Sequence, residues 1–175
     1  MLTRIVALVS GLVGAVVSAG CASSTAPPAN DPPVALEALE VRTKAVATLL
    51  DDWHAAAARA DEAAYFGAFA REAVFLGTDA TERWDVAAFR AYAHPRFAVG
   101  KSWEFTSTAR RIQFSQDASV AWFDEDLQTP NLGPARGSGV IVREAGAYKI
   151  AQYNLSVPIP NERFEAVRHI IAGTP

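Results

Sequence analysis

The sequence contains one cysteine, Cys21, and only three histidines among its 175 residues. A single cysteine excludes an intramolecular disulfide, and three scattered histidines do not give the ligand spacing of a zinc site. Basic residues are also fewer than acidic ones, 16 against 19. Nucleic acids favour a basic partner, so we expect no nucleic-acid binding. We also expect no bound metal.

Motifs of several enzyme classes are absent as well. Gly137-Ser138-Gly139 lies inside a predicted strand, where glycine more often marks a bend than a phosphate-binding loop. No Gly-x-Ser-x-Gly segment occurs, which disfavours a serine hydrolase. The sequence therefore predicts a domain without a cofactor.

Long hydrophobic runs are also lacking. The uncharged segment from Ile5 to Gly20 is interrupted by glycine and serine and is short for a spanning helix, which needs about 20 mostly apolar residues. Arg4 precedes this segment and small residues end it, a pattern typical of a secretory signal. We predict that residues 1–20 are a signal peptide.

The segment Val17-Ser18-Ala19-Gly20-Cys21 resembles the lipobox of bacterial lipoproteins, although that family prefers leucine where Ser18 stands. The resemblance implies that Cys21 is acylated and anchors the protein to a membrane. Residues 21–33 would then be the lipidated cysteine and a flexible, proline-rich tether. The expected location is the cell envelope, at the periplasmic face of an outer membrane if one is present. The alternative is a plain secretory signal with a leftover thiol.

Residues 34–171 have the pattern of one α+β domain. Apolar residues recur at helical spacing over residues 34–60, and Asp61 and Asp85 are suited to cap two further helices. We expect the helix after Asp85 to stop at His94-Pro95, because the residue before a proline disfavours the helical conformation. A short strand is expected over residues 73–76 and a last helix over residues 161–171.

The second half of the domain is rich in aromatic and β-branched residues separated by turn signals. It predicts an antiparallel meander with strands near residues 102–115, 118–129, 136–144 and 147–157. Helices followed by strands favour a curved antiparallel sheet wrapped around the N-terminal helices.

Several segments across residues 36–165 resemble the nuclear-transport-factor-2-like superfamily, and within it the SnoaL-like branch. They are Asp52-Trp53-His54, Tyr65-Phe66, residues 73–79, Thr81-Glu82-Arg83-Trp84, Ala121-Trp122-Phe123, residues 136–139 and residues 148–153. The resemblance implies a cone of strands around a helix, with a cavity at the wide end. Members of that superfamily include polyketide cyclases, ketosteroid isomerases, dehydratases and subunit-association domains, so the fold alone does not give a function.

Strand alternation indicates which side chains face such a cavity. Glu125 is the acid expected to point inward, and Arg136 is expected beside it. These two form either an acid/base site or an ion pair that holds two strands in register. On the last strand, one set turns Gln152 and Asn154 inward, and the opposite set turns Tyr153 inward instead.

Two further residues are candidates for acid/base chemistry. His54 follows Trp53 on the first helix, where the resembled enzymes place a polar group, although it also fits a surface position. Asp79 follows the first short strand, near the position of a proton-shuttling aspartate in the resembled isomerases, but its sequence also makes an ordinary turn. The predicted cavity walls are Trp53, Phe69, Trp84 and Trp122.

Three functions remain open from the sequence. The leading hypothesis is a tethered domain that binds a small, partly apolar molecule through Glu125, Arg136, Gln152 and Asn154. The second is a cofactor-independent isomerase, cyclase or dehydratase acting on a carbonyl compound, with His54, Asp79 or Glu125 as base. The third is a homodimer or other interaction domain, which would have a filled cavity and an apolar outer sheet face.

Overall fold

The computed structural model describes residues 33–173 of the chain, with side chains from residue 38 onward. The predicted signal peptide (1–20), Cys21 and all of the predicted tether (21–33) except Pro33 lie outside the described residues.

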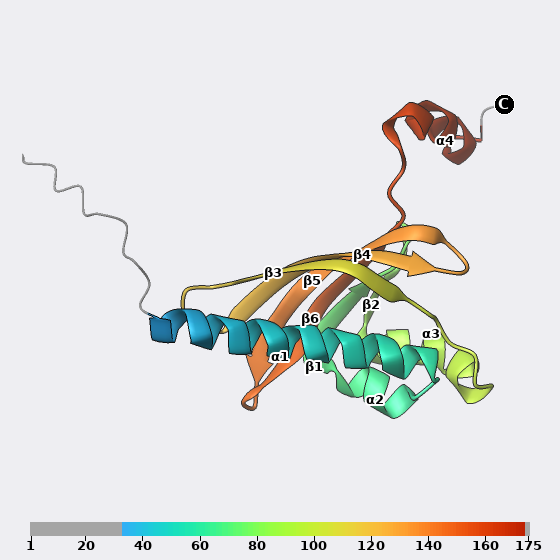
Figure 1. Ribbon diagram of the computed structural model, residues 1–175. Coiled ribbons are helices and arrows are strands. Elements are labelled where there is room, and N and C mark those ends of the chain that lie inside the picture. The colour runs from blue at the N-terminus through green and yellow to red at the C-terminus, as the bar shows by residue number, and fades with distance from the viewer. Residues whose placement is uncertain (1–32, 174–175) are drawn as a thin grey trace, which may run out of the picture. The chain divides into compact units, whose positions relative to one another are not determined.

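The described chain forms four α-helices, one short 3₁₀ helix and six strands (Figure 1). In chain order they are α1 (Pro33–Ala58), α2 (Glu62–Gly67), β1 (Phe69–Leu76), β2 (Arg83–Asp85), α3 (Val86–Ala98), β3 (Thr106–Phe114), β4 (Val120–Thr129), β5 (Gly133–Glu144), β6 (Ala147–Ser156), η1 (Asn161–Arg163) and α4 (Phe164–Ile171).

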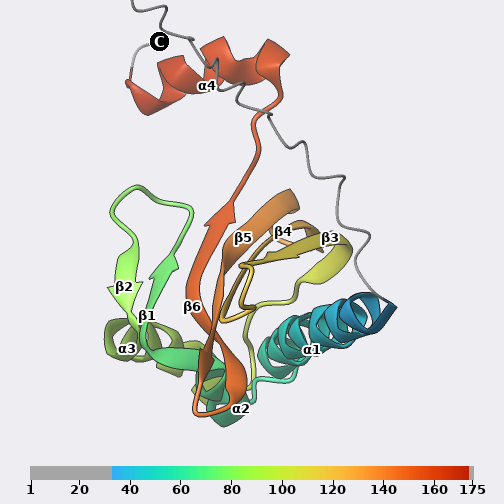
Figure 2. The same ribbon diagram turned by 90° about the vertical axis from the view of Figure 1, so that its left-hand side faces the viewer.

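The strands form one sheet in the order β2-β1-β6-β5-β4-β3. Strands β3 to β6 are the predicted antiparallel meander, and β2 pairs with β1 in the same antiparallel way. Strand β1 adds to the sheet in parallel with β6, a pairing that the sequence did not indicate. The sheet curves around α1 (Figure 2), so the predicted α+β class with a curved sheet around N-terminal helices is confirmed.

Two aspartates begin helices as their sequence positions predict. Asp61 Oδ1 accepts a hydrogen bond from the Ala64 N–H at 2.9 Å, and Asp85 Oδ1 accepts one from the Ala88 N–H at 2.8 Å. Each carboxylate thereby satisfies a backbone donor that has no partner within the helix. The two caps fix the starting points of α2 and α3.

The predicted end of α3 at His94-Pro95 is wrong, because the helix continues to Ala98 with Pro95 inside it. A proline inside a helix costs one backbone hydrogen bond and about 3 kcal/mol. Continuing the helix leaves Phe97 only 5% exposed. Burying a phenylalanine contributes about 1.5–3 kcal/mol, which offsets much of that cost.

The core lies between α1 and the concave face of the sheet. Buried side chains of α1 recur at helical spacing and include Val46, Leu50, Trp53 and Ala57. They belong to one apolar cluster with buried residues of β4, β5, β6 and α3. This cluster holds α1 against the sheet and so determines where its polar residue His54 points.

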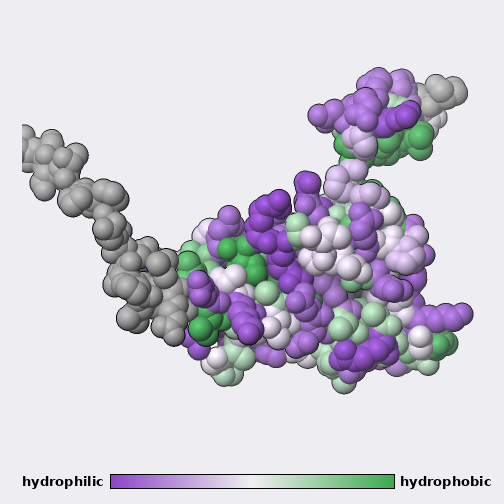
Figure 3. All heavy atoms as spheres, viewed as in Figure 1, coloured by the Kyte–Doolittle hydropathy of each residue, from purple (hydrophilic) through white to green (hydrophobic). Residues whose placement is uncertain are grey.

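Helix α4 keeps apolar side chains at the surface. Phe164, Ile170 and Ile171 are 59%, 76% and 79% exposed. Figure 3 shows green, hydrophobic spheres on this helix. Within residues 33–173, no helix is both long enough and apolar enough to cross a membrane.

Candidate functional site

A cavity of about 240 Å³ opens between α1, α3 and the sheet. Its wall is mainly aromatic and contains Trp53, Tyr65, Phe75, Trp84, Phe89, Tyr92, Trp103, Phe105 and Tyr153. A smaller set of polar side chains joins them: His54, Thr78, Glu82, Arg96, Thr129 and Asn131. An apolar wall with a few polar groups is typical of a site for a small molecule.

His54 links this cavity to a buried carboxylate. The helix turns His54 toward β4, where its Nε2 lies 2.8 Å from Oε1 of Glu125. Glu125 is 0% exposed, and its predicted inward orientation is therefore correct. The hydroxyl of Tyr153 on β6 donates a second hydrogen bond to the same oxygen at 3.0 Å. Side chains from two separate elements, α1 and β6, therefore converge on the carboxylate of Glu125.

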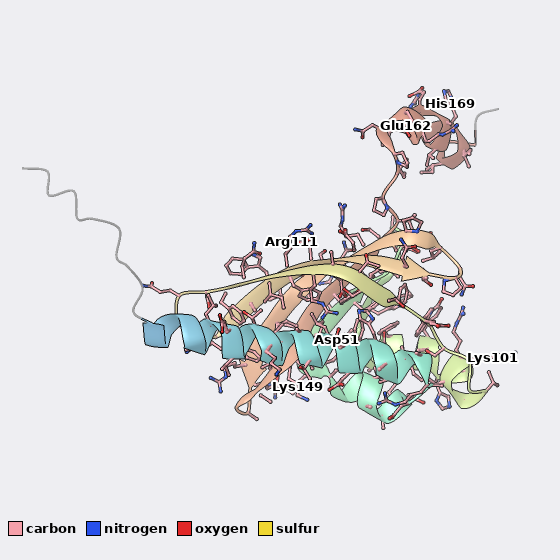
Figure 4. The ribbon with its side chains drawn as sticks, in the orientation of Figure 1. Asp51, Lys101, Arg111, Lys149, Glu162 and His169 are labelled. Carbon is pink, nitrogen blue, oxygen red and sulfur yellow. The ribbon has the colours of Figure 1, made fainter. Side chains whose placement is uncertain are left out.

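The other oxygen of Glu125 is held by Arg110, which lies directly opposite it on β3. Arg110 Nε donates to Oε2 at 2.8 Å, and Nη2 lies equally close without the alignment of a hydrogen bond. Its Nη1 donates to Asp51 Oδ1 at 2.8 Å and to the Ala47 carbonyl at 3.1 Å. Figure 4 shows Asp51 on α1. Arg110 therefore ties α1 to the sheet beside His54.

These contacts keep Glu125 ionised. Burial by itself raises the pKa of Glu125, but the hydrogen bond from His54 and the positive charges of His54 and Arg110 outweigh it, so that the pKa is lower than usual. Burial and the charge of Glu125 raise the pKa of Tyr153 well above its ordinary value. Tyr153 therefore keeps its proton and donates a hydrogen bond to the carboxylate.

The charge of Glu125 determines which nitrogen of a neutral His54 carries the proton. An ionised carboxylate can only accept hydrogen bonds, so the proton lies on Nε2 and the lone pair on Nδ1. A histidine held in this way has the lone pair of Nδ1 available to accept a proton. This is the arrangement of a general base with an orienting carboxylate.

One buried donor in the wall has no partner. Trp53 is 3% exposed, and its Nε1 forms no hydrogen bond within the part of the chain that the structure describes. Its ring packs against His54, with 4.9 Å between the ring centroids. A buried N–H without an acceptor is costly, so an acceptor atom on a bound molecule would be favourable here.

The expected pairing of Glu125 with Arg136 is wrong. The loop Pro130–Leu132 leaves Thr129 opposite Gly133, and this register places Gly137 opposite Glu125 and Arg136 opposite Asp126. Because facing residues alternate, a shift of one position turns Arg136 to the outer face. There its side chain is 54% exposed, 3.9 Å from Asp126.

The expected orientation of β6 changes partway along the strand. Ile150 is buried, as predicted, but β6 has a bulge at Ala151, where Ile150 pairs with Ile141 and Gln152 with Val140. The extra residue reverses the alternation beyond it. Gln152 is therefore exposed and Tyr153 buried, so the alternative set is the correct one for this half of the strand. Asn154, two residues further along β6, does not line the cavity either.

The remaining candidates are divided between the cavity and other places. Trp53 and Trp84 lie in the cavity wall. Phe69 lies in the apolar core instead, and Trp122 is 46% exposed on β4. Asp79 is exposed and accepts hydrogen bonds from the N–H and hydroxyl of Thr81 at 2.8 and 2.6 Å, which lower its pKa, so it serves as a turn residue.

The outer face of the sheet is largely polar. Arg111 pairs there with Asp124 at 3.0 Å, on the side of the sheet away from α1 (Figure 4). Arg136 of β5 and Asp126 of β4 lie opposite each other on the same face. Trp122 lies there opposite Gln113 and Val140, so this face carries apolar side chains as well as charged ones.

Arg110 is the functional residue that sequence reasoning missed. A signal was present, because Arg110 shares its strand parity with Ile112 and Phe114, which pack against the core. A charged residue in register with inward apolar residues needs a buried partner. Glu125 is that partner.

Metal ligands do not gather at this site. Within the residues that the structure describes, no group of three or more histidine, cysteine, aspartate or glutamate side chains could hold a metal ion.

Comparison with protein families gives a match to the SnoaL-like domain over residues 46–160, about two thirds of the chain. The chain belongs to the SnoaL-like family. A comparison with curated proteins found no match. The family assignment agrees with the curved sheet, the central α1 and the cavity.

Several solved structures share the SnoaL-like fold. A nuclear-transport-factor-2-like protein of unknown function from Pseudomonas putida has 14% identity and a TM-score of 0.59, covering 71% of this chain and 91% of its own. A provisionally named scytalone dehydratase from Novosphingobium aromaticivorans has 9% identity and a TM-score of 0.60, with 71% and 89% covered.

A provisionally named ketosteroid isomerase from Parabacteroides distasonis has 15% identity and a TM-score of 0.53, covering 66% of this chain and 86% of its own. At these identities the likeness extends to the fold alone.

Proposed function

We propose that the cavity binds a small, partly apolar molecule and that His54 exchanges a proton with it, without a cofactor. The observation that carries this proposal is the 2.8 Å contact between Nε2 of His54, in the cavity wall, and the fully buried Glu125. Glu125 is a buried carboxylate with three polar partners, one of which lies in the cavity wall. Such arrangements tune a general base at a reaction site.

Each residue has a defined role in this mechanism. His54 takes a proton through Nδ1 from a carbon next to a carbonyl group. Glu125 orients the ring and stabilises its charged form, and Arg110 and Tyr153 hold Glu125 in place. The unpartnered N–H of Trp53 would donate to the substrate oxygen, where negative charge develops as the proton leaves.

Proton transfer beside a carbonyl begins isomerisation, cyclisation or dehydration. The provisional names of two fold neighbours, a ketosteroid isomerase and a scytalone dehydratase, fall within this range of chemistry. We therefore propose an enzyme of this class for the SnoaL-like domain of the present chain.

The test is deuterium exchange into a panel of small cyclic ketones in D₂O, followed by proton NMR. We expect the wild-type protein to accelerate exchange for at least one ketone and His54→Gln to lose about 10²–10⁴-fold of that rate. The chain contains a matched control, because His94 Nδ1 also lies 2.8 Å from a carboxylate, that of Glu62, but at the surface. His94→Gln should keep the full rate.

Binding without chemistry gives a different result. Native mass spectrometry of the protein from its own cell envelope, before and after organic extraction, detects a retained small molecule. A retained molecule together with exchange that His54→Gln does not change would contradict the catalytic role and leave a binding domain. If the protein neither retains a small molecule nor accelerates exchange for any ketone of the panel, the proposal is refuted entirely.

We further propose that the mature protein is anchored in the cell envelope through a lipid on Cys21. The support is the sequence pattern of residues 1–21 alone. Metabolic labelling with a radioactive fatty acid should label the wild-type protein and not Cys21→Ala. Equal labelling of both proteins would refute the anchor.

A further inference from the structure

Arg96 is held in the cavity wall by two aromatic rings. It lies on α3, and its Cζ is 5.8 Å from the ring centroid of Tyr92 and 5.6 Å from that of Trp103. All three residues line the cavity. Such cation–π contacts orient a guanidinium group without using its N–H donors.

No carboxylate of the described chain forms an ion pair with Arg96. Arg90, earlier on the same helix, has such a partner, since its Nε lies 2.7 Å from Oε1 of Glu62. Glu82 also lines the cavity, but its Oε2 accepts a hydrogen bond from the Asp79 N–H at 3.2 Å. Arg96 is therefore an exposed cation in the cavity wall that two rings position and that has no ion-pair partner among the described residues.

A series of ring contacts connects Arg96 with His54. The ring centroids of Trp103 and Tyr65 are 6.3 Å apart. Those of Tyr65 and Trp53 are 4.9 Å apart, and those of Trp53 and His54 are also 4.9 Å apart. Arg96 and His54 therefore belong to one continuous aromatic wall of the same cavity.

We propose that the ligand of this cavity is a small aromatic or alicyclic carboxylic acid, whose carboxylate binds Arg96 while its ring lies among the aromatic side chains. The inference deepens the function proposed above and rests on its cavity. Arginine presents a planar pair of donors that matches a carboxylate. Arg96 is the only arginine or lysine among the described residues that line the cavity, and with Glu82 in the same wall it suits a monoanion better than a phosphate dianion.

Two matched pairs of probes test the proposal: indole-3-acetate with indole-3-acetamide, and naphthalene-2-carboxylate with its carboxamide. Binding is followed by NMR titration of the protein at low salt. In each pair the two molecules have nearly the same shape and differ in charge. We expect the acid to bind roughly fivefold more tightly than the amide, the size of a partly exposed ion pair. Added salt should reduce this preference.

Arg96→Gln should remove the preference for the acid and leave the affinity for the amide unchanged. Arg143→Gln is the matched control, because Arg143 also lies over a ring, that of Tyr148, at 5.7 Å, but does not line the cavity. It should keep the preference. If Arg96 only holds Tyr92 and Trp103 in place, Arg96→Gln will weaken both probes equally.

Equal affinity for acid and amide in both pairs, or no binding of either acid at 10 mM (roughly 2.7 kcal/mol of binding free energy), would overturn the inference. Its failure can be separated from that of the proposed chemistry. His54→Gln tests proton exchange and should keep the preference for acids, whereas Arg96→Gln tests ligand charge. One mixed result is possible: the preference for the acid over the amide depends on Arg96, but deuterium exchange does not depend on His54. That result would support the ligand class and refute the catalytic role of His54.

Discussion

Nε2 of His54 lies 2.8 Å from Oε1 of Glu125, although the two residues are 71 positions apart in the chain. The contact joins the central helix α1 to strand β4 at the wall of an aromatic cavity. Arg110 completes the arrangement by holding the second oxygen of Glu125. The same cluster therefore links the stability of the domain to its proposed chemistry.

Replacing Glu125 by glutamine should destabilise the domain by about 3 kcal/mol, because it removes one partner of a buried ion pair and leaves Arg110 without its main counter-charge. Urea unfolding measures the change. Asp124→Asn is the matched control on the same strand, since Asp124 pairs with Arg111 on the exposed face. It should cost less than about 1 kcal/mol. Equal effects of the two variants would contradict a buried, charged Glu125.

The contribution of Glu125 to stability should depend on pH in a defined direction. The pKa of Glu125 in the folded protein is below the ordinary glutamate value of 4.5, so the unfolded chain binds the proton more readily. The stabilisation is therefore complete above about pH 4.5 and is lost as the pH falls through the folded pKa. The free energy of unfolding of wild type minus that of Glu125→Gln should shrink as the pH falls below this value. A difference that grows on acidification would show that Glu125 is buried as the neutral acid.

Gly137 should not tolerate a side chain. A Cβ at this position would meet the hydroxyl of Tyr153 and come within 3.0 Å of Cγ of Glu125. Gly137→Ala should cost about 1–3 kcal/mol and displace Tyr153 from Glu125. Gly67→Ala is the control, because nothing lies within 4 Å of its Cβ and the change reduces the entropy of the unfolded chain. Thermal unfolding should show a lower midpoint for Gly137→Ala and no decrease for Gly67→Ala.

Asp117 should titrate with a pKa of about 2. Its Oδ1 accepts hydrogen bonds from the hydroxyl of Ser115 at 2.7 Å and from the hydroxyl and N–H of Ser119 at 2.9 and 3.1 Å. Carbon-13 NMR of the side-chain carboxyl measures the value directly. Replacing both serines by alanine should raise the pKa toward 3.8. An unchanged value in that variant would mean that the two hydroxyls do not lower it.

Local patterns in the sequence determined much of the fold. Apolar spacing predicts α1, side-chain chemistry predicts the caps at Asp61 and Asp85, and alternating residues predict four consecutive strands. The inward orientation of Glu125 also follows from alternation along β4. Each of these features depends on residues close together in the chain, so a sequence contains the information needed to predict it.

Only the tertiary structure decided which other residues join Glu125. The loop after Thr129 sets the register that turns Arg136 outward, and the bulge at Ala151 turns Tyr153 inward in place of Gln152. A change of one residue in a turn or bulge reverses every side chain beyond it, and packing between strands decides whether that change occurs. The contact of His54 with Glu125 and the exposure of Arg96 to the cavity likewise depend on how α1 and α3 pack against the sheet, which no local pattern specifies.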